Sequence, residues 1–287
     1  MKRVAWNPLT TDRLGDLIRF LGPREAHCAA FTAKLLNNGR VIVPDGNEHR
    51  VIVRIDPTGR IDAAILQGKS GHYYPVLGDS SCQVERSGIS LLRQGTRRIY
   101  SVMGRAKDVA ALEVAFSKQP TRAVEYHLMA QDSAPPETPL PRLPKDLAIV
   151  RAGPTDAGRL SAIQKLYEVE EVLLPGSTFD AAASLQHLKA ALHTQIIIQG
   201  TIGSATVAKA GTNARGLFFD QIGGVFTVPS VRSRGVGTAL MLRLLNLVAG
   251  QEKSATLFVK MDNGPALKMY RNLGFRVVDG FRISYYR

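Results

Sequence analysis

The residues best suited to chemistry lie in the stretch 224–240, where an apolar run gives way to a basic turn that contains glycine. A β-prone apolar segment is followed by Arg232 and Arg234, and Gly235 and Gly237 then open a helical pattern. The first N–H groups of a helix have no partner within the helix, and the positive end of the helix dipole lies beside them. Glycines let an anion approach such a backbone without meeting a Cβ atom. The pattern predicts a binding site for a pyrophosphate.

A second motif follows a short distance along the chain. The strand-like run 255–260 leads into a helical segment that contains Asn263, Ala266 and Tyr270, and residues 273–275 read Leu-Gly-Phe. An asparagine before Gly-Pro is a common helix cap, because its side chain accepts a hydrogen bond from a free backbone N–H. A tyrosine with an ordinary pKa of about 10 keeps its proton at neutral pH and can donate it. The segment therefore offers a capped helix and a proton donor.

Together the two motifs resemble those of the GNAT superfamily of acyl-CoA-dependent N-acyltransferases. The family's pyrophosphate motif, Gln/Arg-x-x-Gly-x-Gly/Ala, matches Arg232, Gly235 and Gly237, and its later Asn-x-x-Ala-x-x-x-Tyr and Leu-Gly-Phe match the second segment. The motifs cover 224–275 without a break, and the expected order of elements fits from about residue 147 to the end. The resemblance implies an α/β (α+β) fold with a mixed, mostly antiparallel sheet flanked by helices.

The resemblance also implies that the ligand of this region is acetyl-CoA, or coenzyme A after the reaction. In the family, the strand before the turn pairs with the pantetheine amides, and the N–H groups of the turn, here 234–238, bind the pyrophosphate. Lys268 and Arg271 are further candidates for phosphate contacts, and solvated surface charges are an equally good interpretation of both. The predicted cofactor-binding residues are Phe226, Thr227, Val228, Arg232, Arg234, Gly235, Val236, Gly237, Thr238, Asn263, Ala266 and Tyr270.

For catalysis, the resemblance implies that Tyr270 protonates the thiolate that leaves when an amine attacks the thioester. Packing against Phe275 is the structural alternative for the same side chain. The two cysteines, Cys28 and Cys82, lie far from the motifs, so we expect direct transfer without a covalent enzyme intermediate. The histidines show no spacing typical of metal ligands, and no metal site is predicted.

The general base is harder to assign from the sequence. Many members of the family carry a glutamate on the strand before the turn, and the corresponding residue here is Ile222, which cannot accept a proton. Asp220 is the nearest carboxylate, two residues earlier and on the same strand face. Glu171, with its neighbours Glu168 and Glu170, is the other candidate, on a helix expected to border the acceptor site. A solvated acidic face is the more common role of any one such glutamate. Water-relayed deprotonation, or an acceptor that arrives as a free amine, would need none of these carboxylates.

A proline-rich segment divides the chain. Five prolines fall within residues 133–145, which favours an extended connector over a helix or a central strand. We therefore expect an N-terminal α/β domain over 1–132, a linker over 133–146 and the GNAT acetyltransferase domain over 147–287. The two expected domains show a similar order of helices and strands, which suggests an internal duplication. The chain should end in two short strands, 275–278 and 281–286.

The first half carries no comparable motif. The turn that corresponds to the pyrophosphate turn, 77–82, contains one glycine, and its Asp79 would repel a phosphate. If this half is a second GNAT-like copy, the sequence predicts that it is degenerate and no longer binds coenzyme A. We expect it instead to help shape the acceptor site.

Composition limits the remaining possibilities. The net charge is +13, and residues 201–287 hold 12 Lys/Arg against 4 Asp/Glu, which attracts polyanions of any kind. Nucleic acid remains a minority option, since no RNA- or DNA-binding motif accompanies the charge. No apolar run is long enough for a membrane span, and no signal peptide is expected. Two cysteines are too few for a disulfide framework, which favours reduced thiols and a cytoplasmic location.

The sequence thus predicts an acetyl-CoA-dependent N-acetyltransferase of the GNAT type that acts on an amine of unknown identity. The acceptor could be a small molecule, a peptide N-terminus, a protein lysine or an aminoacylated RNA. The main alternative, motivated by Ile222 at the usual base position, is a catalytically silent protein that binds acetyl-CoA and regulates a partner. The sequence leaves the oligomeric state open.

Overall fold

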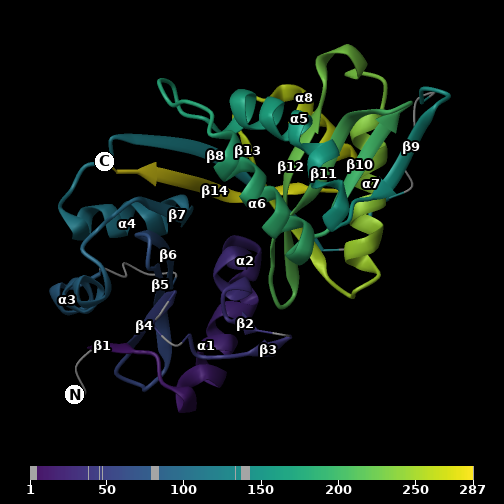
Figure 1. Ribbon diagram of the computed structural model, residues 1–287. Coiled ribbons are helices and arrows are strands. Elements are labelled where there is room, and N and C mark those ends of the chain that lie inside the picture. The colour runs from purple at the N-terminus through teal and green to yellow at the C-terminus, as the bar shows by residue number, and fades with distance from the viewer. Residues whose placement is uncertain are drawn as a thin grey trace.

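The computed structural model describes residues 5–37, 39–44, 46, 48–78, 84–132, 134–136 and 143–286. Its centre is one 12-stranded sheet with the strand order β1-β4-β5-β6-β7-β14-β8-β13-β12-β11-β10-β9 (Figure 1). All neighbouring strands pair antiparallel except β6 with β7 and β12 with β13. This confirms the predicted mixed, mostly antiparallel sheet.

The first half of the chain contributes β1 to β8 and four α-helices. The strands of the large sheet are β1 (Ala5–Pro8), β4 (His49–Ile55), β5 (Ile61–Gly68), β6 (His72–Leu77), β7 (Ser101–Arg105) and β8 (Arg122–Gln131). A separate two-stranded sheet contains β2 (Leu36–Asn37) and β3 (Arg40–Val41). The helices are α1 (Leu14–Leu21), α2 (Glu25–Ala33), α3 (Arg86–Gly95) and α4 (Ala106–Phe116), with short 3₁₀ turns η1 (Thr11–Arg13) and η2 (Gly22–Arg24).

The second half contributes β9 to β14 and again four α-helices. The strands are β9 (Leu147–Arg151), β10 (Ile197–Ile202), β11 (Ala205–Arg215), β12 (Phe219–Thr227), β13 (Ser254–Lys260) and β14 (Arg276–Tyr285). The helices are α5 (Ala157–Tyr167), α6 (Ala181–Thr194), α7 (Val236–Ala249) and α8 (Gly264–Asn272). Shorter helical turns are η3 (Pro154–Asp156), the π-helical η4 (Glu168–Val172) and η5 (Pro229–Val231).

The sheet has the same strand pattern when it is read from either edge. Four antiparallel strands come first, and a strand that pairs in parallel with the fourth follows. The two halves then exchange their last strands, because β7 pairs with β14 and β13 pairs with β8. The exchanged strands also pair with each other at the centre, where Figure 1 shows them side by side. This symmetry supports the predicted internal duplication.

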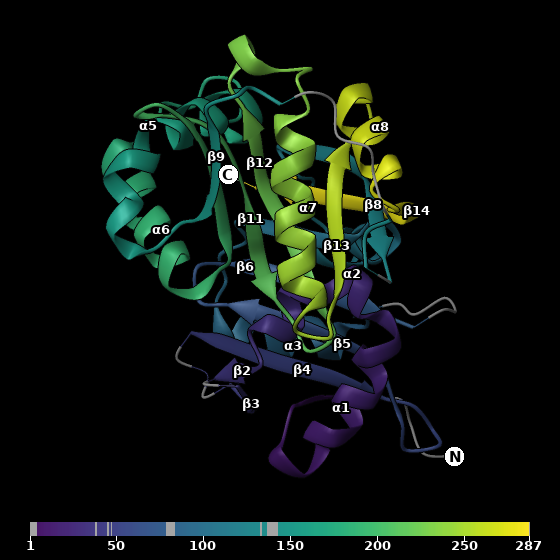
Figure 2. The same ribbon diagram turned by 90° about the vertical axis from the view of Figure 1, so that its right-hand side faces the viewer.

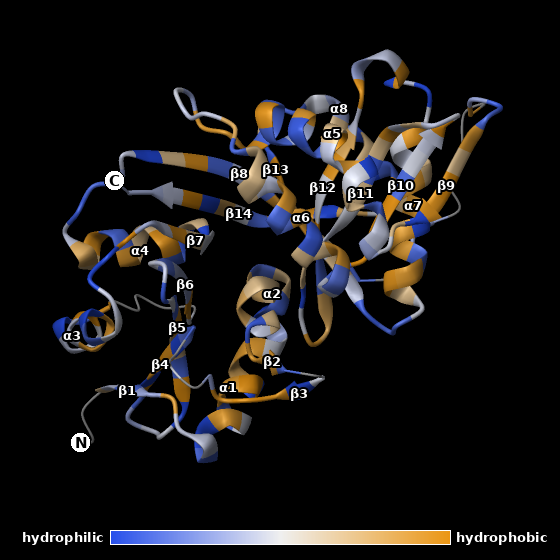
Figure 3. Ribbon diagram, in the orientation of Figure 1, coloured by the Kyte–Doolittle hydropathy of each residue, from blue (hydrophilic) through white to orange (hydrophobic). Residues whose placement is uncertain are grey.

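Four clusters of buried side chains hold the helices to the sheet. Helices α7 and α8 pack in one cluster and α3 and α4 in a second, while α1 with α2 and α5 with α6 form two more. Figure 2 shows α7 lying across β11, β12 and β13, with α8 beside it. In Figure 3, α5 and α6 carry both hydrophobic and hydrophilic residues, and the residues that α5 buries include Leu160 and Ile163. Such amphipathic helices gain most of their stability from burying one face.

The predicted boundaries differ from the observed ones mainly near the chain end. Instead of two short strands, β14 is continuous, and a register shift between Val277 and Asp279 accommodates the residues between them. Ser133 and residues 137–142 of the predicted linker lie outside the described residues, as do Asp79 and Cys82.

A buried carboxylate joins the two halves at the β11–β12 turn. Glu25 at the start of α2 is fully buried, and its carboxylate accepts hydrogen bonds from the N–H groups of Leu217 (2.6 Å), Phe218 (2.5 Å) and Phe219 (3.2 Å). Thr32 donates a further hydrogen bond to it. Buried N–H groups without acceptors are costly, so this one side chain satisfies three donors of the other half.

Glu25→Gln should destabilise the protein, because one carboxylate oxygen becomes an NH₂ group that faces backbone donors. We expect the free energy of unfolding to fall by on the order of 2 kcal/mol or more. Urea denaturation measures the change, and Glu48→Gln, at an exposed position, is the matched control. Equal stability of the two variants would show that Glu25 does not hold the halves together.

Candidate active site

The cleft of this protein opens where two parallel strands diverge. β12 and β13 pair from Phe219 and Ser254 to Gln221 and Thr256, and their carboxyl-terminal parts then separate. A cleft of about 770 Å³ lies there, lined on one side by residues 222–227 of β12 and on the other by residues 257–260 of β13. A crevice at the carboxyl ends of diverging strands is a common place for ligands in α/β proteins.

The predicted pyrophosphate turn forms one end of the cleft. Gly235 precedes α7 in the left-handed conformation (φ 75°), which favours glycine, and its carbonyl accepts the N–H of Ala239 at 2.9 Å. Helix geometry leaves the N–H groups of residues 236–238 without an intrahelical partner, and these residues line the cleft. A Cβ atom at Gly237 would lie 3.3 Å from Thr227 Oγ1, so a larger residue would make a tight contact at this end of the cleft. The turn is therefore a cradle of backbone donors that glycine keeps open.

Arg232 is held in place beside this cradle. Its Nε donates to the Thr227 carbonyl at 2.8 Å, and one terminal nitrogen donates to both carboxylate oxygens of Glu170, at 2.7 and 2.9 Å. The guanidinium thus lies at the cleft wall and ties η4 to the turn.

Two of the predicted cofactor-binding residues fall outside the cleft lining. Val228 donates its N–H to the Val207 carbonyl at 2.9 Å, so this donor belongs to the sheet and cannot pair with a ligand as predicted. Arg234 is exposed and is absent from the lining residues of the described chain. The other ten predicted cofactor-binding residues line the cleft: Phe226, Thr227, Arg232, Gly235, Val236, Gly237, Thr238, Asn263, Ala266 and Tyr270.

Helix α8 forms the opposite wall. Asn263 caps it, with Oδ1 accepting the N–H of Ala266 at 3.2 Å, so the helix-cap interpretation holds while the residue also lines the cleft. Lys268 lines the cleft, whereas Arg271 on the same helix does not. Of the two cationic candidates for additional phosphate contacts, only Lys268 therefore faces the predicted site.

Tyr270 lies inside the cleft and is almost completely buried. Its ring contacts Phe275 edge-on, with centroids 5.9 Å apart, so the packing role and the position in the cleft coexist. Burial raises the pKa of Tyr270, and Tyr167 and Glu171 raise it further by adding negative potential. The hydroxyl consequently keeps its proton at neutral pH and remains available as a donor.

The three candidate glutamates have different environments on the π-helical η4. Glu171 lines the cleft and forms an ion pair with Lys260 at 2.9 Å, and Glu170 lines the cleft and binds Arg232. Glu168 instead accepts hydrogen bonds from Ser184 and Gln164, each at 2.8 Å, and points away from the cleft. Short π-helical segments often occur at functional sites. Glu171 is the carboxylate that the structure brings near Tyr270.

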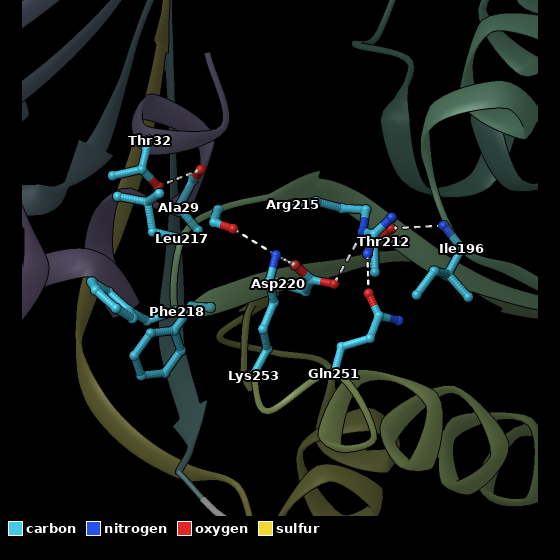
Figure 4. Close-up of polar contacts among 12 residues, drawn as sticks. Ala29, Thr32, Ile196, Thr212, Arg215, Leu217, Phe218, Asp220, Gln251 and Lys253 are labelled. Atoms are coloured by element: carbon cyan, nitrogen blue, oxygen red, sulfur yellow. Dashed lines mark hydrogen bonds and ion pairs between the residues drawn. The ribbon is translucent and has the colours of Figure 1, made fainter. Parts of the chain in front are cut away.

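Asp220 is a structural residue, which contradicts the prediction that it acts as the base. Its carboxylate is fully buried between Arg215 Nε (3.3 Å) and Lys253 Nζ (3.1 Å), as Figure 4 shows. This ion-pair cluster lies where β12 is still paired with β13, before the cleft opens. Ile222, at the usual base position, does line the cleft. Strand periodicity predicts that Asp220 and Ile222 share one face of β12, but it cannot predict the point at which β12 and β13 separate.

Lys209 on β11 belongs to no sequence motif, and it lies outside the lining of the cleft. The side chain is buried, and its Nζ lies 4.4 Å from the Tyr167 ring centroid and 2.9 Å from where a Cβ atom at Gly224 would be. Desolvation lowers the pKa of Lys209 to about 8, and Glu168 opposes part of this shift. The sequence feature that could have indicated this side chain is the Gly-Gly pair at 223–224, because glycines within a strand often mark a close approach of a neighbouring group.

The corresponding place in the first half is filled. β6 and β7 also pair in parallel for a short distance, but Arg105 donates to the Leu77 carbonyl at 2.7 Å and Leu77 N–H donates to Asp108 at 3.3 Å. Arg105 and Asp108 are paired at 2.8 Å. A hollow of only about 10 Å³ lies between residues 74–76 of β6 and residues 103–104 of β7, where α2 also lines it. Side chains thus occupy the strand edge that a pantetheine arm would need. Whether the first half binds coenzyme A stays a prediction, because residues 79–83 of the corresponding turn lie outside the described residues.

Within the described residues, no group of three or more His, Cys, Asp or Glu side chains could hold a metal ion. Among the helices described, none is both long and apolar enough to cross a membrane.

Comparison with known proteins places these features in a family context. Residues 219–283 match the model of the FR47-like protein family. No curated protein matches the chain. A Drosophila protein of solved structure is similar over 99% of both chains, with 13% identity and a TM-score of 0.69. A tandem GNAT protein from the clavulanic acid biosynthesis pathway covers 99% of this chain and 98% of its own, with 13% identity and a TM-score of 0.58.

A third structure extends the likeness to bacteria. The GNAT-family acetyltransferase of Colwellia psychrerythraea covers 98% of this chain and 99% of its own, at 9% identity and a TM-score of 0.54. At such identities the likeness concerns the fold, and it extends over both halves. The protein therefore shares the fold of these GNAT structures over its whole length, and the FR47-like match is confined to residues 219–283.

Proposed function

We propose that this protein is an N-acetyltransferase that transfers the acetyl group of acetyl-CoA directly to an amine. The observation that carries the proposal is the cleft between β12 and β13, which has the glycine cradle of residues 235–237 at one end and Tyr270 within it. The FR47-like match over 219–283 covers the same elements.

Acetyl-CoA fits the chemistry of this cleft. The β12 edge at Phe226 and Thr227 pairs with β11 on one side only, so the other side offers amide groups to the pantetheine arm. The free N–H groups at the start of α7, with the helix dipole, suit a pyrophosphate. Arg232 beside the cradle and Lys268 on the α8 wall add positive charge from two sides of the cleft.

The proposed reaction forms one bond and breaks one. The acceptor nitrogen bonds to the carbonyl carbon of the thioester, the C–S bond breaks, and the electron pair stays on sulfur. Tyr270 gives its proton to that sulfur, and coenzyme A leaves as the thiol. Glu171 receives the proton lost by the amine, since Ile222 cannot and Asp220 lies outside the cleft.

The proposal includes the organisation of the chain. We assign the acetyltransferase domain to residues 147–287 and the degenerate GNAT-like domain to 1–132, joined by the linker 133–146. The cytoplasmic location stays an inference from cysteine chemistry, with Cys28 a free, buried thiol. Cys82 lies outside the described residues.

Gly237→Asp should abolish the binding of acetyl-CoA, because it places a Cβ atom and a negative charge in the cradle. For the natural protein, acetyl-CoA at 100 times its Kd should stabilise the fold by about 2.7 kcal/mol, and the variant should show no such stabilisation. Thermal unfolding with and without acetyl-CoA measures the difference. Gly158→Asp is the control, because Gly158 is exposed and has open space around it. An unchanged stabilisation of the Gly237 variant would refute the cradle.

Tyr270→Phe should keep the affinity for acetyl-CoA and lower kcat by on the order of 10²-fold, since only the proton donor is lost. Because burial raises the pKa of Tyr270, the donor stays protonated and the loss should be the same between about pH 7 and 9. Initial rates of thiol release with an amine panel give kcat, and Tyr100→Phe, at an exposed tyrosine, is the control. Full activity of Tyr270→Phe would assign the acid to another group.

Glu171→Gln should lower kcat/KM at least tenfold near neutral pH without changing the stabilisation by acetyl-CoA, because the proton acceptor is removed. Glu168→Gln is the matched control, on the same helix but directed at Ser184 and away from the cleft. Equal losses in both variants would indicate a structural effect of η4. Activity retained in both would mean that the acceptor arrives as the free amine. If the natural protein binds acetyl-CoA but releases no thiol with any amine, the silent regulatory function replaces the enzyme.

A further inference from the structure

Lys209 is a buried charged group beside the cleft that the proposed reaction does not use. Within the described chain its ammonium has no hydrogen-bond acceptor, and it contacts the ring face of Tyr167, with Nζ 4.4 Å from the ring centroid. Glu168 is near enough to act on its charge, but that carboxylate accepts hydrogen bonds from Ser184 and Gln164. A buried ammonium without an acceptor costs free energy, and such groups are concentrated at functional sites.

Tyr167 lies between Lys209 and the cleft. It is the last residue of α5, it lines the cleft, and its ring packs edge-on against Phe226 with centroids 6.3 Å apart. Its hydroxyl is close to Tyr270 and to Tyr126 of β8, because it helps to raise the pKa of each. The ring face of Tyr167 therefore contacts the ammonium, while its hydroxyl lies among the groups of the proposed reaction.

A bulge in β12 brings a backbone donor to the same hydroxyl. The pairing of β11 with β12 shifts in register here, so residues 224–225 lie opposite one residue of β11. Gly224 has the left-handed conformation (φ 61°) in this bulge. Burial raises the pKa of Tyr167 to about 12 and Glu171 raises it further, whereas the Gly224 backbone opposes the rise by hydrogen bonding to the hydroxyl. A hydroxyl that accepts from an N–H keeps its own proton for a second partner.

The thioester of the proposed complex belongs beside this hydroxyl. The pantetheine arm would follow β12 from the cradle past Thr227 and Phe226, and its sulfur would lie at Tyr270. The carbonyl carbon is the next atom after sulfur, so it falls near Gly224, two residues back along the same strand. A fixed donor aimed at the oxygen on which charge develops is often the largest single contribution to catalysis.

We propose that Tyr167 is a further catalytic residue, whose hydroxyl donates a hydrogen bond to the thioester carbonyl oxygen, and that Lys209 is a positioning residue behind its ring. This inference rests on the proposed acetyl transfer. As the amine nitrogen bonds to the carbonyl carbon, an electron pair moves to the oxygen. Tyr167 stabilises this oxyanion and keeps its proton, and the pair returns to carbon as the C–S bond breaks. The cation on the ring face holds the ring and makes the hydroxyl a stronger donor.

Tyr167→Phe keeps the ring over Lys209 and removes only the hydroxyl. We expect kcat to fall by on the order of 10²-fold and the affinity for coenzyme A to stay the same. Binding gives a second measurement, because S-ethyl coenzyme A lacks the carbonyl oxygen. By calorimetry, the natural protein should bind acetyl-CoA about fivefold more tightly than S-ethyl coenzyme A, and Tyr167→Phe should bind the two equally. Tyr100→Phe, at an exposed tyrosine, is the control and should behave like the natural protein.

Lys209→Met tests the positioning role, because it removes the charge and nearly keeps the length of the side chain. We expect kcat to fall about tenfold at pH 7. Thermal unfolding should show equal or higher stability, since the buried charge without an acceptor is gone. A lysine with a merely structural role would instead leave a less stable protein. Lys165→Met is the matched control, because Lys165 is exposed and lies over the ring of Phe179, 5.5 Å from its centroid.

The pH dependence of kcat separates the charge of Lys209 from its packing. Desolvation lowers the pKa of Lys209 to about 8, so the cation is present below that pH and is lost above it. Tyr167 and Glu168 are the titratable groups beside it, and its neighbours on β10 and β12, Gln199 and Phe226, carry no charge. The ratio of kcat for the natural protein to kcat for Lys209→Met should therefore fall from about ten at pH 7 to about one above pH 9.

Several outcomes would overturn the inference. If Tyr167→Phe still prefers acetyl-CoA to S-ethyl coenzyme A, or keeps the natural kcat, its hydroxyl does not hold the carbonyl oxygen. A kcat ratio that rises with pH would make Lys209 a proton acceptor, and a constant ratio with lower stability would make it structural. Failure of the natural protein to bind either thioether or thioester would refute the proposed function, whereas equal binding of both would refute only the role of Tyr167.

Discussion

The exchange of the last strands, β8 and β14, is the constraint on which the rest of the structure depends. Each half ends its own run of strands at a parallel pair, and the next strand of the sheet comes from the other half. Neither half has a complete sheet alone, since removing one would expose the full edge of the other's fifth strand. The buried carboxylate of Glu25 reinforces this joint at the β11–β12 turn. The shape of the cleft depends on the same joint, because β8 pairs with β13, which forms one wall of the cleft.

The molecule therefore contains two places where a pair of parallel strands separates. The side chains at each place determine how much space lies between the strands. In the second half, glycines at the turn and in β12 keep the backbone accessible, and the divergence is an open cleft. In the first half, Arg105 and Asp108 bind the strand edge at Leu77, and little space remains. The same backbone topology thus gives an open cleft in one place and, among the described residues, a closely packed strand edge in the other. The difference is a matter of a few residues.

The parts of the site that depend on local chain geometry could be predicted from the sequence. Gly235 and Gly237 act on their own turn, and Tyr270 lies one helix further on, so spacing along the chain was informative. Tyr126 could not be found in this way, because its place in the cleft depends on strand pairing across the whole sheet. Asp220 shows the limit of periodicity, which gives the face of a strand but not the point at which its neighbour diverges. The order of the elements predicted the fold class, whereas no local sequence pattern indicated the exchange of β8 and β14 between the halves.

The pairing of β8 with β13 and of β14 with β7 has a consequence for the history of the chain. It is the arrangement of a domain-swapped dimer whose two subunits have been joined into one polypeptide. In a symmetric dimer, every substitution appears in both clefts, so neither can change without the other. Once joined, one copy is free to lose its ligand while it keeps its structural contribution to the other. The strand exchange itself places Tyr126 of the first half in the cleft of the second, whereas the Arg105–Asp108 pair is a difference that only joined copies can acquire.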